Sequence, residues 1–144
     1  MKHILASRSK ESGQGLVEFA MVLVIMMILL AGVVDLGRAF FTFLSLRDAA
    51  QEGAVYASIN PTDQTSIVNR VRHSSAQPVN LNDPANIDVQ VNFTGMACAG
   101  NGVEVVVKYD RFPLSMPFLG AILGSQTIAI RARVTDTILT PPCG

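Results

Sequence analysis

The sequence has little charge and few of the residues that carry metal or redox chemistry. Charged residues make up 15% of the 144 positions, tryptophan is absent, and there are two histidines and two cysteines. The cysteines, Cys98 and Cys143, lie far apart without a CxxC spacing, so the usual ligand patterns of a zinc site are missing. We therefore expect no metal ion and no cofactor.

Neither sign of charge is in excess. Eleven Lys and Arg balance eleven Asp and Glu, so the formal net charge is zero, and no whole-chain field attracts nucleic acid or an anionic substrate. The sequence also lacks a Gly-rich phosphate loop, an HExxH motif and a GxSxG motif. Nucleic acid is therefore not an expected partner, and catalysis is not the expected function.

Apolar residues are what the chain has in excess, at 49% of its positions with a mean hydropathy of +0.38. This content excludes intrinsic disorder. The excess is concentrated in residues 16–34, LVEFAMVLVIMMILLAGVV, where Glu18 is the only charged residue. A helix of this run spans roughly 28 Å, close to the thickness of a bilayer's hydrocarbon core. We expect a transmembrane helix over residues 16–34.

The short segment before this run is basic, with Lys2, Arg8 and Lys10 against Glu11. An excess of Lys and Arg beside a membrane helix predicts that this end stays in the cytoplasm. We expect a single-pass protein of the cytoplasmic membrane with its N-terminus inside and its C-terminus outside. The alternative is a secretory signal peptide, for which the apolar run is too long.

No proline interrupts residues 35–59, so the helix is expected to leave the membrane and continue to Asn60, which precedes Pro61 and therefore avoids helical geometry. This outer half is amphipathic, with an apolar seam and a polar side that recur at spacings of three and four. The seam is Ala39, Phe43, Leu46, Ala50, Gly53 and Ala57, and the polar side is Arg38, Thr42, Ser45, Asp48 and Glu52. The seam packs either on the chain's own sheet or on a helix of another subunit.

Residues 60–144 are expected to form a small extracytoplasmic α+β domain. Thr62 is the expected N-cap of a short amphipathic helix that continues to Ser74 or Ser75. Three later stretches, residues 87–93, 103–109 and 128–134, alternate apolar and polar residues as strands with one buried side do. The amphipathic half of the long helix is expected to cover the apolar side of this antiparallel sheet.

The two cysteines flank the ends of these strands. Cys98 lies in the glycine-rich loop between the first two strands, and Cys143 follows the third. If the third strand is antiparallel to the second, its end approaches that loop, which favours an intramolecular disulfide. Two free thiols and a covalent link between subunits are the alternatives.

Residues 112–123, FPLSMPFLGAIL, are unusually apolar for a connection between two strands. One interpretation is that they line the edge of the small domain's core. The other is a contact with a neighbouring subunit or with the membrane surface, because exposed apolar patches usually mark interfaces.

Gly13, Gln14 and Glu18 stand at the start of the apolar run, behind the basic leader. This spacing resembles the type III signal of type IV pilin-like proteins, which a membrane-embedded prepilin peptidase cuts after the glycine. Over about residues 13–57 the sequence resembles more narrowly the TadE-like proteins of the tight-adherence (Tad) pilus system. The matching residues are Glu18 and Phe19, Asp35, Gly37 and Arg38, Ala49 and Ala50, and Glu52, Gly53 and Ala54.

The resemblance implies a leader over residues 1–13 that is removed, a long helix over residues 14–59 and a pilin-like outer domain over residues 60–144. It implies three kinds of partner: other pilin subunits, the prepilin peptidase and the inner-membrane pilus assembly platform. The processed protein would end in a surface pilus that serves adhesion, and its sizeable outer domain resembles minor pilins or pseudopilins. The alternative is an uncleaved, single-pass membrane-anchored module that binds an extracytoplasmic partner.

Glu18 is the residue we expect to govern assembly, because a carboxylate in a membrane helix usually marks function or a partner. Cleavage after Gly13 would create an α-amino group at Gln14 for it to neutralise, within one chain or between neighbours. The alternative is an interfacial glutamate whose side chain merely reaches the headgroups. Asp35 and Arg38, three residues apart where the helix leaves the membrane, suit an exposed ion pair or a contact with another subunit.

Overall fold

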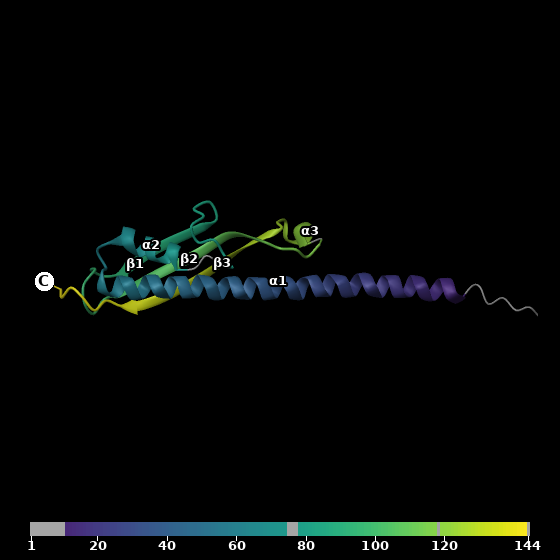
Figure 1. Ribbon diagram of the computed structural model, residues 1–144, viewed down its shortest axis with the longest axis horizontal. Helices are drawn as coiled ribbons and strands as arrows, with labels where there is room; N and C mark the ends of the chain where they lie inside the picture. Colours follow the sequence, from purple (N-terminus) through teal and green to yellow (C-terminus); the bar gives the residue numbers. More distant parts are fainter. Residues whose placement is uncertain (1–10, 75–77, 118, 144) are drawn as a thin grey trace, which may run out of the picture.

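The computed structural model describes residues 11–74, 78–117 and 119–143, and the basic residues 2, 8 and 10 of the expected leader lie outside them. One long helix carries a small sheet domain along its C-terminal half, and its N-terminal half extends alone (Figure 1). In chain order the elements are α1 (Glu11–Ile59), α2 (Gln64–His73), β1 (Ile87–Thr94), β2 (Gly102–Pro113), α3 (Leu119–Leu123) and β3 (Thr127–Thr137). The expected α+β fold is confirmed, and α3 is an element that the sequence analysis did not anticipate.

Helix α1 is long and apolar enough to cross a membrane, and none of its most apolar stretch is buried within the chain. The large apolar side chains between residues 16 and 34 all lie on its surface, apart from the partly covered Ile28. Water contact with this much apolar surface is unfavourable at about 25 cal/mol per Å². The N-terminal half of α1 therefore fits a single-pass membrane anchor.

The sheet has the order β1-β2-β3, and both strand pairs are antiparallel. Val105 lies at its centre, opposite Val91 on one side and Val134 on the other. The residues of β2 that face α1 are fully buried, and they are Val103, Val105 and Val107. The three expected strands are confirmed, although β2 continues to Pro113 because pairing resumes between Phe112 and Ile128 after an irregularity.

Small residues of α1 form the surface that packs on this sheet. Four residues of the expected seam are buried there, together with two neighbouring alanines: Leu46, Ala50, Gly53, Ala57, Ala49 and Ala54. Ala39, at the start of the seam, is partly buried against the same core. The seam therefore contacts the chain's own sheet, which is the first of the two partners considered for it.

Three residues of the amphipathic pattern have an exposure opposite to the one that their spacing along the helix predicts. Phe43, expected in the seam, is 38% exposed, whereas Thr42 and Ser45, expected on the polar side, are 4% and 8% exposed. Thr42 and Ser45 lie on the side of α1 that faces residues 78–87 and the end of β2, so the covered face of the helix moves around its axis along its length. A regular spacing of three and four does not follow that movement.

Gly53 lies where α1 approaches both α2 and β2. A Cβ there would overlap Cγ2 of Val71 and come within 3.4 Å of Cγ1 of Val105. We expect Gly53→Ala to lower the free energy of unfolding by about 1–3 kcal/mol, the usual cost of overpacking a core. Denaturant unfolding of the purified chain measures the loss.

Gly37→Ala is the matched control for this substitution. Among the described residues, nothing lies within 4 Å of a Cβ built at Gly37. The same change should therefore stabilise the chain by up to about 1 kcal/mol, through helix propensity alone. If Gly53→Ala and Gly37→Ala change the free energy of unfolding equally, the side chains around Gly53 accommodate the added methyl group without cost.

Helix α2 starts from Asp63 and not from Thr62, which the sequence analysis favoured. The Asp63 carboxylate accepts a hydrogen bond from the backbone N–H of Ser66 at 3.0 Å, as an N-cap does. Hydrogen bonds from the Ser66 side chain and backbone hold the pKa of Asp63 below its ordinary value. Thr62 belongs to the turn that follows Pro61, the helix ends at His73, and Ser75 lies outside the described residues.

Candidate functional site

The expected processing site lies in the first turns of α1, where Gly13 and Gln14 are helical and exposed. Among the described residues, nothing comes within 4 Å of a Cβ built at Gly13. Packing within the chain therefore does not require a glycine at this position. Gly13 lies in the first turn of the helix as described, where backbone N–H groups have no partners within the helix.

Glu18 is exposed on α1, four residues after Gln14 and therefore on the same side of the helix. It forms no ion pair with any residue that the structure describes. Large exposed apolar side chains flank it, among them Val17 and Phe19. The carboxylate thus stands alone at the start of an apolar surface, about one helical turn from Gln14.

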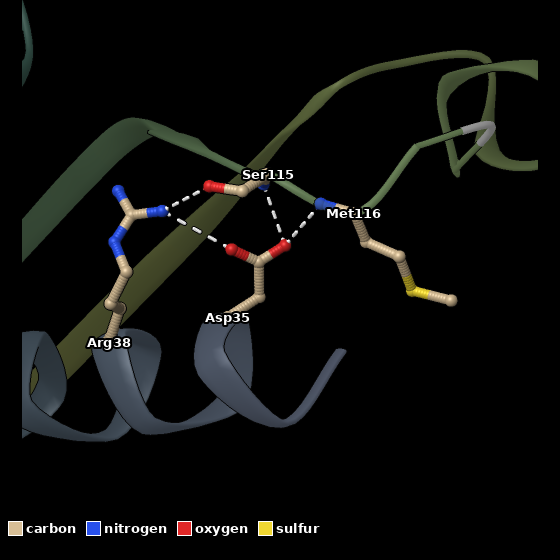
Figure 2. A network of polar contacts seen from close by, with 4 residues as sticks. All are labelled: Asp35, Arg38, Ser115 and Met116. Carbon is tan, nitrogen blue, oxygen red and sulfur yellow. Dashed lines mark hydrogen bonds and ion pairs between the residues drawn. The ribbon is translucent and has the colours of Figure 1, made fainter. Parts of the chain in front are cut away.

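Asp35 anchors a segment that is distant in the sequence (Figure 2). Its Oδ2 accepts hydrogen bonds from the backbone N–H of Ser115 at 2.6 Å and of Met116 at 2.7 Å. Its Oδ1 lies 3.2 Å from Nη1 of Arg38, which also donates to Oγ of Ser115 at 2.6 Å. We call these four residues the Asp35 clamp.

The clamp corrects the expectation of a simple exposed ion pair. Arg38 does lie beside Asp35 and stays partly exposed, but Asp35 is only 4% exposed because the segment after β2 covers it. The Arg38 guanidinium also lies 5.3 Å from the centre of the Phe112 ring, a cation–π contact. The pair therefore joins α1 to the end of β2 within one chain.

The sequence around the clamp explains why a carboxylate is needed. Pro113 and Pro117 bracket Leu114, Ser115 and Met116, and the chain here has left the sheet, so the N–H groups of Ser115 and Met116 have no strand to bond. A buried N–H without an acceptor is costly, and the Asp35 carboxylate serves two of them. The sequence shows Asp35 as an acidic residue at the end of an apolar run, but it does not show that Asp35 binds the backbone of residues 115 and 116.

We expect Asp35→Ala to release this segment. The variant leaves two backbone N–H groups without their acceptor, which costs about 2 kcal/mol of local stability. Amide hydrogen exchange should then be faster at Ser115 and Met116 and unchanged at Val105 in the sheet centre. Asp35→Asn keeps one acceptor oxygen, so its exchange rates at Ser115 and Met116 should lie between those of the wild type and those of Asp35→Ala. Unchanged protection in Asp35→Ala would show that the clamp does not hold the segment.

A cleft of about 850 Å³ separates the expected polar side of α1 from residues 78–87. Asp48 and Glu52 line it from the helix, and Asp83 and Asn86 face them from the loop. Ser45 also lines it, and its buried Oγ has no hydrogen-bond partner among the described residues. Within those residues, no three His, Cys, Asp or Glu side chains are grouped so that they could hold a metal ion.

The end of the sheet domain farthest from the apolar half of α1 is tied by the C-terminal segment. Cys98 and Cys143 form a disulfide, with Cα atoms 5.1 Å apart. The N–H groups of Leu139 and Thr140 donate to the carbonyl of Ser58, at 2.8 and 3.4 Å. These bonds satisfy a carbonyl at the C-terminal end of α1, where helices leave acceptors free.

Comparison with known proteins gives one family. Residues 13–55 match the family described as TadE-like protein, which covers most of α1 and includes Gly13, Glu18, Asp35 and Arg38. No curated protein and no solved structure matches the chain. The sheet domain lies outside the family match. The match confirms the resemblance seen in the sequence: over residues 13–55, which lie in α1, the chain is similar to TadE-like proteins.

Proposed function

We propose that this protein is a structural, pilin-like subunit of a Tad pilus that a prepilin peptidase cleaves after Gly13 and that assembles through α1. One observation carries the proposal. The residues that match the family, 13–55, belong to the helix whose apolar half the chain leaves uncovered. Such a surface needs a membrane before assembly and the helices of other subunits after it. The subunit's contribution is structural rather than catalytic.

Cleavage would change the end of α1 in two ways that favour assembly. It would remove residues 2, 8 and 10, the basic residues expected to hold the N-terminus in the cytoplasm, together with Glu11. The remaining chain has eight Lys and Arg against ten Asp and Glu, and its new α-amino group lies four residues from Glu18. Pairing of that amine with Glu18 of a neighbouring subunit would set the axial register of the filament.

The sheet domain leaves the apolar half of α1 open to contact with other subunits. It packs against the C-terminal half of α1 and does not cover the N-terminal half (Figure 1). Exposed apolar side chains continue beyond the expected membrane segment, at Leu36 and Phe40. Neighbouring subunits would therefore have an apolar helical surface to pack on, with each sheet domain outside the helical core.

The test is the intact mass and N-terminal sequence of the protein in membranes and in sheared surface material, with and without the host's prepilin peptidase. We expect a chain that starts at Gln14 in the sheared fraction when the peptidase is present. The same mass spectrum reports N-methylation of Gln14. An uncut chain confined to membranes in both strains would instead favour the uncleaved membrane-anchored binding module.

Two valine variants make this test specific. Gly13→Val should block cleavage, because it changes the residue whose carbonyl the peptidase attacks. Gly15→Val is the matched control, since it places the same side chain in an equally open position, with nothing described within 4 Å of either Cβ. Cleavage of both variants at the same rate would count against Gly13 as the processing site.

A further inference from the structure

The tip of the sheet domain that lies nearest to the apolar half of α1 carries no charge. Residues 112–130 contain no Asp, Glu, Lys, Arg or His, and α3 lies within this stretch, at the end of the domain toward the N-terminus of α1 (Figure 1). Ile122 of α3 is 79% exposed. An apolar side chain this exposed, in a long uncharged segment, indicates a partner that is itself apolar.

The Asp35 clamp fixes the level of this tip along α1. Residues 115 and 116 bond to Asp35, which directly follows the apolar run at residues 16–34. A Cβ built at Gly32 would lie 3.5 Å from Sδ of Met116, so the segment reaches the last turn of that run. The tip is therefore held where α1 would emerge from a bilayer.

Other residues at this level have the character of a membrane interface. Phe40 and Phe41 are exposed on α1, and no charged residue lies between Arg38 and Arg47. The Arg38 side chain, 43% exposed, stands at the same level, where a guanidinium can reach lipid phosphates. Exposed apolar rings beside a cation whose head can reach the phosphates fit a position at the edge of a bilayer.

We infer that α3 is a second membrane contact, in which Ile122 inserts into the bilayer surface on the side of the sheet domain while α1 spans the membrane. The inference rests on the proposed membrane anchoring of α1. A bilayer is favoured over a protein partner because five residues of helix bury too little surface to hold a protein, whereas the anchor already brings them to the lipid. The contact would hold the domain in one orientation until the subunit is extracted.

The absence of tryptophan from the chain allows a direct test. The full-length Ile122→Trp variant is reconstituted in phosphatidylcholine vesicles whose acyl chains are brominated close to the headgroups. We expect its emission to shift to shorter wavelength and to lose intensity to bromine. Leu139→Trp, 65% exposed on the C-terminal segment, is the matched control and should show neither change. Emission from Ile122→Trp that matches this control would overturn the inference.

A third variant separates this inference from the proposed anchoring. Leu29→Trp reports on the middle of the apolar run and should be quenched by deep-bromine lipids. Quenching at 29 without quenching at 122 overturns the contact of α3 and leaves the anchor intact, whereas no quenching at either position overturns both. A blue shift at 122 that grows with protein density, without bromine quenching, would assign the tip to a second copy of this chain and overturn the lipid contact.

The clamp provides a further check on the same reporter. Asp35→Ala combined with Ile122→Trp should lose most of the bromine quenching, because the tip is no longer held at the level of the headgroups. Quenching equal to that of Ile122→Trp alone would show that the clamp does not set the level of α3.

Discussion

Glu18→Gln is expected to abolish filament assembly while α1 still inserts into the membrane. Glutamine keeps the length of the side chain and removes its charge, so the α-amino group of Gln14 would enter the filament core without a counter-charge. Removing one partner of a buried pair costs about 3–5 kcal/mol, a factor of at least about a hundred in each subunit contact. The amount of subunit in sheared material, relative to membranes, measures the effect.

Glu52→Gln is the control for this prediction. Glu52 is also an exposed carboxylate on α1, but it lies beside the sheet domain and pairs with Arg70 at 3.2 Å. Surface pairs of this kind contribute little, so this variant should assemble normally. If Glu18→Gln filaments are as abundant as those of Glu52→Gln, Glu18 is an interfacial glutamate without a partner.

The features that could be predicted from the sequence are those encoded by neighbouring residues. The long apolar run and the absence of proline along α1 predicted its extent to within the first turn, and its end before Asn60 follows from Pro61. Alternation within residues 103–109 identified the central strand, because successive side chains in a strand point to opposite faces. Both signals are local, so no knowledge of the tertiary arrangement was needed.

The features that could not be predicted depend on contacts between distant residues. Asp35 and Ser115 are 80 residues apart, and the groups that Asp35 binds are backbone N–H groups, which no side-chain pattern reveals. The burial of Thr42 and Ser45 depends on residues 78–87 and the end of β2, which face this side of α1. The spacing of residues along a helix defines its faces but not which of them the sheet covers.

Replacing both cysteines with alanine is expected to lower the free energy of unfolding of the sheet domain by roughly 4 kcal/mol, the loop-entropy value for a bridge across 45 residues. A native domain has about 5–15 kcal/mol of stability in total, so the variant should lose a large share of it. The bridge constrains the C-terminal segment against the loop that holds Cys98. Denaturant unfolding in detergent, followed by the midpoint and slope, measures the loss.

Backbone hydrogen bonds also join the C-terminal segment to the loop that holds Cys98. Ala99 N–H donates to the carbonyl of Pro141 at 2.7 Å, and Gly100 N–H to that of Ile138 at 2.9 Å. If the double variant unfolds at the wild-type midpoint, the disulfide does not limit the freedom of the unfolded chain, and the prediction is wrong. Reduction of the wild-type protein should reproduce the double variant, whereas Met96→Ala, exposed in the same loop, should leave the midpoint unchanged. Agreement between the reduced protein and the variant would assign the loss to the cross-link itself and not to the missing sulfur atoms.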